Sequence, residues 1–226
     1  MGTITRTLAN NITTAGRIAA SGITNTSISA VTDLPSGAEL NDSFQLISSQ
    51  TASSSASISF TSGLDDTYDV YCFRYFDIHP ETDAKNFLVD FSADGGSNYN
   101  LNKQTTLFQA QHAEADNDSS ISYNTSGDLQ NTTGGVNLER FLGADADQAA
   151  SGELYLYSPD STTFAKYFKS ITVIAERNDY AQIGFIGGYV NSTSAINAVK
   201  FEMSSGDIDS GTIKLFGIRN VGIGGI

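Results

Sequence analysis

Side chains suited to nucleophilic catalysis are few in this chain of 226 residues, which contains two His and one Cys. A Ser or Cys nucleophile needs a neighbouring His as its base and an acid that orients the His. His79 ends an apolar run and His112 opens an acidic stretch, and neither lies in a G-x-S-x-G motif. Cys72 lies inside the apolar run, which favours a buried, unreactive thiol. The sequence therefore predicts no catalytic residue and no enzymatic activity.

Paired carboxylates are the other chemistry to consider, because glycoside hydrolysis uses one carboxyl group as an acid and a second as base or nucleophile. The chain contains 25 Asp and Glu residues. No motif in the sequence selects one pair among them. Degradation of polysaccharide is therefore kept as a third alternative, behind two kinds of non-enzymatic role.

Acidic loops could supply oxygen ligands for Ca²⁺. Three Asp-x-Asp pairs occur, at Asp116/Asp118, Asp145/Asp147 and Asp207/Asp209. None is completed to an EF-hand loop with its closing Glu, so solvated loops are the simpler interpretation. Asp116 and Asp118 are the candidate ligands for a structural Ca²⁺. Two distant His and one Cys do not make a zinc site, and no other cofactor is expected.

Aromatic side chains near turns are candidates for contact with glycans. Sandwich-fold lectins often stack sugars on aromatic rings, and this chain has ten Tyr but no Trp. Tyr99, Tyr123 and Tyr189 lie in or near turn-like segments. Tyr is also common in ordinary sheet packing. A host surface glycan is therefore an alternative partner.

The charge is unevenly distributed along the chain. Twelve Lys and Arg against 25 Asp and Glu give a net charge of −13. Residues 1–32 contain Arg6, Arg17 and no acid, so they carry +2 and the remaining chain carries −15. Nucleic acid is excluded as a partner, because phosphate binding needs a basic surface. Neither a secretory signal nor an apolar run of membrane-spanning length is recognised, so membrane insertion is not expected.

Residues 1–42 are predicted to form an N-terminal docking arm. Isolated apolar and basic side chains lie between Thr, Ser and Asn, and a turn follows at Asp33–Gly37. Such a weakly apolar segment needs a surface to lie on, although a disordered terminus is the alternative. The candidate docking residues are Ile4, Arg6, Leu8, Ile12, Arg17 and Ile18.

Residues 43–226 are predicted to form an all-β domain, an antiparallel β-sandwich (jelly roll). About nine strand-like segments occur at fairly regular spacing with few helix signals. The strongest covers Tyr68–Ile78, and in 198–203 alternation predicts one buried and one wet face. Alternation in the strongest segment places Val70, Cys72, Phe76 and Ile78 on one face and Tyr71, Phe73 and Tyr75 on the other.

Other segments refine this organisation. Ala113–Gly135 is acidic and poor in apolar residues, which predicts a long surface loop with a short strand near Ile121. Residues 136–143 are predicted to form a helical turn. Ser151–Tyr157 and Ser210–Phe216 share the pattern S-G-x-[L/I]-x-L-aromatic, which predicts related positions in the two sheets.

Four segments carry a resemblance to a known group of proteins. They are MGTITRTLANNITTAG, TYDVYCFRYFDIHPETD, DGGSNYN and SSGDIDSGTIKLFGI. Together they span most of the chain, and it resembles small virion structural proteins of tailed bacteriophages, particularly those of marine bacteria. The resemblance implies a jelly-roll or concanavalin-like sandwich displayed on the particle, as a head-decoration (cement) protein, a tail or fibre component, or a receptor-contacting knob. It carries over no catalytic residue.

These observations predict a non-enzymatic structural protein of a phage virion. We expect it to be made in the host cytoplasm, displayed on the virion surface, and docked by residues 1–42 to capsid or tail proteins. A homo-oligomer is expected because virion components assemble by symmetry, and a trimer is the working hypothesis. The alternative is a glycan-binding, receptor-contacting knob of the tail or fibre.

Overall fold

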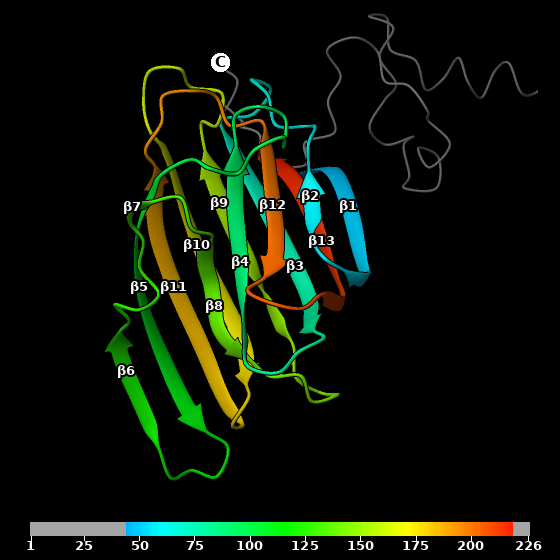
Figure 1. Ribbon diagram of the computed structural model, residues 1–226, viewed down its shortest axis with the longest axis vertical. Helices are drawn as coiled ribbons and strands as arrows, with labels where there is room; N and C mark the ends of the chain where they lie inside the picture. The colour runs from blue at the N-terminus through cyan, green and yellow to red at the C-terminus, as the bar shows by residue number, and fades with distance from the viewer. Residues whose placement is uncertain (1–43, 219–226) are drawn as a thin grey trace, which may run out of the picture. The chain divides into compact units, whose positions relative to one another are not determined.

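The computed structural model describes residues 44–218, which form thirteen β-strands (Figure 1). No helix occurs within this range, so none there is long and apolar enough to cross a membrane. The strands are β1 (Phe44–Ser55), β2 (Ile58–Phe60), β3 (Val70–Pro80), β4 (Lys85–Ser92), β5 (Lys103–Ala113), β6 (Ser119–Tyr123), β7 (Gln130–Thr132), β8 (Val136–Leu142), β9 (Ala150–Tyr157), β10 (Lys166–Glu176), β11 (Tyr180–Val190), β12 (Ala198–Met203) and β13 (Ile208–Ile218).

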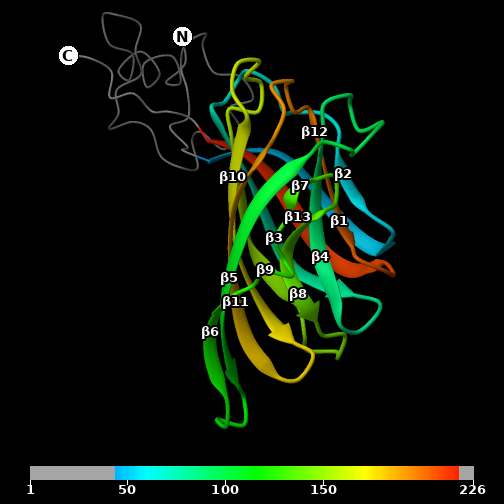
Figure 2. The same ribbon diagram turned by 60° about the vertical axis from the view of Figure 1, so that its left-hand side comes forward.

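The strands form two layers that are antiparallel throughout. The larger layer has the order β1-β13-β3-β9-β10-β11-β5-β6, and the smaller has the order β8-β4-β12-β2, with β7 paired to one end of β5. A single backbone pairing, between Leu142 of β8 and Glu176 of β10, links the layers. Figure 2 shows β4, β12 and β2 on one side and β10, β11 and β5 on the other. The predicted all-β fold, an antiparallel β-sandwich of the jelly-roll kind, is confirmed.

Aromatic rings fill the space between the layers. Tyr75 of β3 lies 5.3 Å from Phe87 of β4, and Phe73 lies 5.4 Å from Phe201 of β12. Each of these side chains is fully buried. Burial of a side chain of this size contributes about 1.5–3 kcal/mol. This aromatic cluster therefore stabilises the packing of the two layers. In β12 the predicted alternation is confirmed, since Val199, Phe201 and Met203 face the core while Lys200 and Glu202 are part-exposed.

The faces of β3 differ from simple alternation at its end. Phe76 and Ile78 were expected on one face, but Ile78 is fully buried and Phe76 is 42% exposed. The pairing with β9 shifts register between Tyr75 and Ile78, and Asp77 between them has φ +52°. An extra residue in a β-bulge reverses which side chains point inward. The bulge turns Ile78 into the core.

Two further predictions about local structure are wrong. Residues 136–143 contain no helical turn, because β8 pairs with β4 and buries Val136, Leu138 and Leu142 in the core. Tertiary packing overrides a weak local helix signal here. The repeated S-G-x-[L/I]-x-L-aromatic segments do not lie in two different sheets. They lie in β9 and β13, the two neighbours of β3 in the larger layer.

Buried polar groups gather under β11 and β5. Gln182 of β11 donates a hydrogen bond to a carboxylate oxygen of Glu139 on β8, and Gln109 of β5 donates to Gln182 at 3.2 Å. The other Glu139 oxygen has no hydrogen-bond partner among residues 44–218. It occupies the space where a side chain on Gly184 would lie. Burial raises the pKa of Glu139 to about 7.

Candidate interaction surface

The residues considered for nucleophilic chemistry lie apart from one another. The Nε2 of His79 lies 3.2 Å from the carbonyl oxygen of Asp145, and His112 lies beside Asp116 at the far end of β5. Cys72 is fully buried on β3. Burial, with a smaller contribution from the charge of Glu153, raises the pKa of the Cys72 thiol to about 11. The thiol is therefore protonated and unreactive at neutral pH.

Asp116 and Asp118, the candidate Ca²⁺ ligands, lie in the turn between β5 and β6. Asp116 has φ +54° and approaches the Nε2 of His112 at 3.2 Å. One oxygen of Asp118 accepts a hydrogen bond from the hydroxyl of Tyr180 at 3.1 Å. Between residues 44 and 218, no three His, Cys, Asp or Glu side chains are grouped so as to hold a metal ion.

The three candidate glycan-contacting tyrosines lie on two sides of the sandwich. Tyr99 packs under the ammonium group of Lys200, on the outer side of β12 in the smaller layer. Tyr123 on β6 and Tyr189 on β11 belong to the larger layer, where Tyr189 pairs with Gln104 and Tyr123 with Phe108 of β5. The structure therefore does not bring the three together. The arm residues Ile4, Arg6, Leu8, Ile12, Arg17 and Ile18 lie outside the described residues.

A different surface emerges from the register of four neighbouring strands. On the outward side of β10, β11, β5 and β6, directly paired residues form two continuous rows. The first row is Ile171, Phe185, Phe108 and Tyr123, and the second is Val173, Ile183, Ala110 and Ile121. We call these eight side chains the apolar face. None of them carries a charge, and none is fully buried.

Several side chains of the apolar face are strongly exposed. Ile121 is 81% exposed, Val173 is 50% and Phe108 is 47% exposed. Phe108 and Phe185 stack with ring centroids 4.8 Å apart and planes within 6° of parallel, so they form a flat aromatic platform. Scattered exposed apolar residues are ordinary, whereas a contiguous patch of them marks a surface that another molecule covers.

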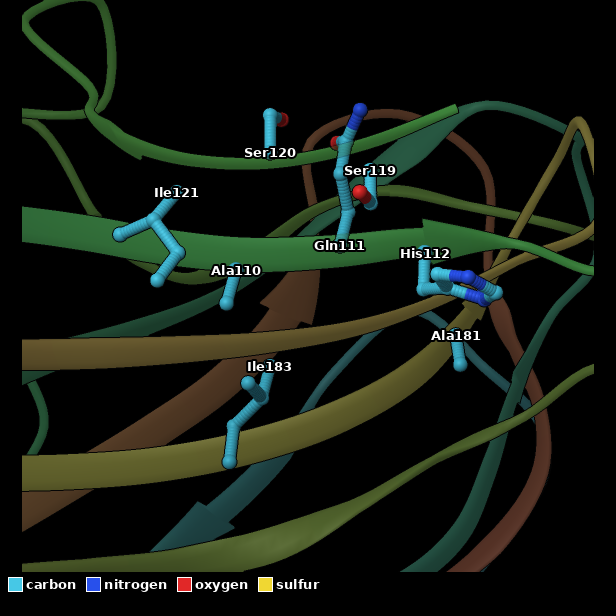
Figure 3. Close-up of a pocket in the computed structure, with 8 residues that line it drawn as sticks. All are labelled: Ala110, Gln111, His112, Ser119, Ser120, Ile121, Ala181 and Ile183. Carbon is cyan, nitrogen blue, oxygen red and sulfur yellow. The ribbon is translucent and has the colours of Figure 1, made fainter. Parts of the chain in front are cut away.

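A shallow open hollow lies at one end of the apolar face (Figure 3). It is lined by Ala110, Gln111, His112, Ser119, Ser120, Ile121, Ala181 and Ile183. The small side chains of Ala110 and Ala181 leave the space, and Ile121 stands beside it. The hollow and the exposed Ile121 make this end of the apolar face uneven.

The other half of the same outward side is built differently. The guanidinium of Arg74 on β3 lies 4.3 Å from the ring centroid of Phe44 and 5.7 Å from that of Phe216. The ammonium of Lys214 lies 5.8 Å from the ring of Phe76. We call this region of β1, β13 and β3 the cation-covered half. Its rings carry cations over them, and such contacts keep aromatic surface compatible with water.

The residues of the apolar face were not identified from the sequence, although one signal was available. In β10 the outward Tyr167, Ile171 and Val173 are aromatic or apolar, while the inward side includes Ser170 and Thr172. A strand with one face in water usually has its polar side chains on that face, and β10 departs from this pattern. Compared with protein-family models, curated proteins and solved structures, the chain matches none.

Proposed function

We propose that the chain is a non-enzymatic structural protein of a phage virion, displayed on the particle exterior and docked by residues 1–42 to capsid or tail proteins. The apolar face is the observation that carries the proposal. An exposed, uncharged, contiguous patch on a folded domain supports a role inside an assembly, because such a patch lowers its free energy when it is covered.

The rest of the described surface suits a particle exterior. Residues 44–218 contain nine Lys or Arg against 22 Asp or Glu, a net charge of −13. Excess charge of one sign favours solubility, and salt screens its self-repulsion. The resemblance to phage structural proteins and the predicted docking arm supply the virion context. A decoration (cement) or fibre component is the specific role we propose.

Particle composition tests this proposal. The chain should co-purify with intact phage particles in fixed stoichiometry, measured by quantitative mass spectrometry of density-purified virions. Hundreds of copies indicate head decoration, and a handful indicate a tail or fibre position. A variant lacking residues 2–34 should fold but should no longer join particles. The assay adds this variant or the full chain to particles that lack the protein and measures how much of each becomes bound. Absence from purified particles would refute the virion role.

A glycan-binding knob is the second candidate, and one pair of side chains favours it. Tyr167 and Tyr189 lie side by side at one end of the outward surface, with ring centroids 6.1 Å apart. Tyr167 is 57% exposed. Paired amphipathic rings with free hydroxyl edges suit contact with a sugar.

A glycan array with purified protein tests the second candidate. Binding should be lost in Tyr167→Ala and retained in the matched control Phe76→Ala, because Phe76 is a 42% exposed ring on β3, outside the tyrosine pair. No binding to any host surface polysaccharide would exclude the knob while leaving the virion role open.

A further inference from the structure

We infer that the apolar face binds a second copy of this chain. The protein is then a two-fold dimer in which the outward sides of the two larger layers pack against each other. The inference rests on the size, charge and shape of the face. It names the occupant of the surface that also carries the proposed function, and the two are tested separately, by mass in solution and by particle composition.

The size of the face fits the central part of one side of a stable dimer. Strands lie about 4.8 Å apart and rise about 3.4 Å per residue, so two rows on four strands, which span about four residues of each strand, give a footprint on the order of 250 Å². Side-chain relief and the flanking Tyr167 and Tyr189 enlarge the accessible area beyond this. A standard interface covers about 800 Å² of each partner. The apolar face therefore provides the centre of such an interface, and the rows on either side of it provide the border.

The charge of the face selects an uncharged occupant. None of the eight side chains is charged, so neither a basic nor an acidic partner surface would find an ion-pair partner within the two rows. The nearest charged or titratable side chains border the rows. Lys169 and Glu153 lie on one side and His112 on another, and a carboxylate oxygen of Asp128 accepts a hydrogen bond from the hydroxyl of Tyr123. A second copy offers a matching uncharged surface and keeps most carboxylates at the rim or beyond, where water solvates them.

The relief of the face is self-complementary. Ile121 of β6 is 81% exposed, and it lines one side of the hollow whose other walls include Ala110 of β5 and Ile183 of β11 (Figure 3). A two-fold axis makes each contact occur twice, so Ile121 of one copy can fill the hollow of the other while the reverse contact forms. One patch that meets its own copy across a two-fold axis produces a closed pair. A trimer would require two different patches, so this face favours a dimer over the trimer that we expected from virion symmetry.

The mass of the full chain in solution is the first test. Light scattering after size-exclusion chromatography should give 48 kDa, twice the 24.0 kDa of the monomer. A monomer would overturn the inference, because the face would then belong to a different occupant. A trimer of 72 kDa, three times the monomer, would overturn it as well.

Two charge substitutions locate the interface. Ile121→Asp and Val173→Asp should each raise the dimer dissociation constant by about 100-fold or more, because each places a carboxylate in an apolar contact. Leu46→Asp is the matched control, since Leu46 is 47% exposed on β1 at the opposite edge of the same layer. It should leave the dimer intact. Dimers that survive Ile121→Asp would overturn the inference.

The variant Ala110→Phe distinguishes a specific fit of Ile121 into the hollow from non-specific hydrophobic association. The larger ring fills the hollow that would receive Ile121 of the second copy, so the dimer should weaken by about tenfold or more. Non-specific apolar adhesion would instead strengthen with the added apolar area, and that result would overturn the proposed fit. Far-UV circular dichroism and the thermal midpoint of diluted protein check folding. Ile121, the most exposed side chain of the face, keeps the test valid if Val173→Asp fails to fold.

Discussion

The two halves of the outward side of the larger layer contain similar aromatic side chains. These side chains are covered by cations in one half and exposed to solvent in the other. In the cation-covered half, Arg74 and Lys214 lie over Phe44, Phe216 and Phe76. In the apolar face, Phe108 and Phe185 stack on each other and stay open to solvent. Aromatic content alone therefore does not mark an interaction surface. The presence or absence of a covering cation distinguishes the two halves.

The largest effect should separate the inward and outward sides of β10 beneath the apolar face. Ile174→Ala should lower the free energy of unfolding by about 2–4 kcal/mol, because Ile174 is buried between the layers. The adjacent Val173→Ala should cost less than about 1 kcal/mol, because Val173 is half exposed. Chemical denaturation in the Ile121→Asp background measures both without a contribution from association. An equal loss of unfolding free energy in the two variants would mean that Val173 is buried in the monomer, and the apolar face would then not be exposed to solvent.

The second effect tests the polar groups that lie under the apolar face. The pKa of Glu139 is raised to about 7 in the folded chain, against an ordinary value of 4.5. Between these values the folded state binds a proton that the unfolded state lacks, so stability is greatest below about pH 4.5 and falls as pH rises toward 7. The shift corresponds to about 3 kcal/mol as an order of magnitude.

Denaturation of wild type and Glu139→Gln across pH 4.5–8 measures this effect. Glu139→Gln should remove most of the decline, because Gln keeps an acceptor for Gln182 and carries no charge. Asp65→Asn is a suitable control, since hydrogen bonds to Thr67 lower the pKa of Asp65 and its titration falls below this window. An unchanged pH profile in Glu139→Gln would show that Glu139 is not the titrating group.

The smallest effect is expected when a covering cation is removed, so that the cation-covered half becomes more like the apolar face. Arg74→Ala uncovers Phe44 and Phe216, which should increase self-association and the binding of a hydrophobic dye. The stability cost should be about 1 kcal/mol, since partly exposed cation–π contacts and surface ion pairs are weak. Lys214→Ala should have a smaller effect, because its ammonium lies farther from a ring. No increase in dye binding would mean that Arg74 does not keep these rings covered.

Local patterns predicted much of the fold because each of them acts within one strand. The strongest segment does form β3, and the alternation of Val199, Phe201 and Met203 matches the buried face of β12. Gly188 lies where a side chain would collide with β5 and Phe168, as a glycine inside a strand pattern suggests. The bulge at Asp77 was missed because nothing in a single strand shows where its partner shifts register.

The apolar face could not be predicted because it depends on pairing between distant segments. Ile171, Phe185 and Phe108 are spread over more than sixty residues, and only the registers of β10, β11 and β5 place them in one row. The tyrosines chosen from the sequence were selected for lying near turns, a local criterion. Two of them, Tyr123 and Tyr189, lie on the outward side of the larger layer, and Tyr99 lies on the smaller layer.

The position of β13 has a consequence for the order of events during synthesis. This last described strand lies between β1 and β3, and Phe44 pairs with Ile218. Until the ribosome has delivered residues 208–218, β1 lacks its neighbour and β3 has an unpaired edge. Closing so long a loop is slow, because its entropy must be lost before the contacts form. The larger layer therefore stays incomplete until residue 218 has emerged from the ribosome.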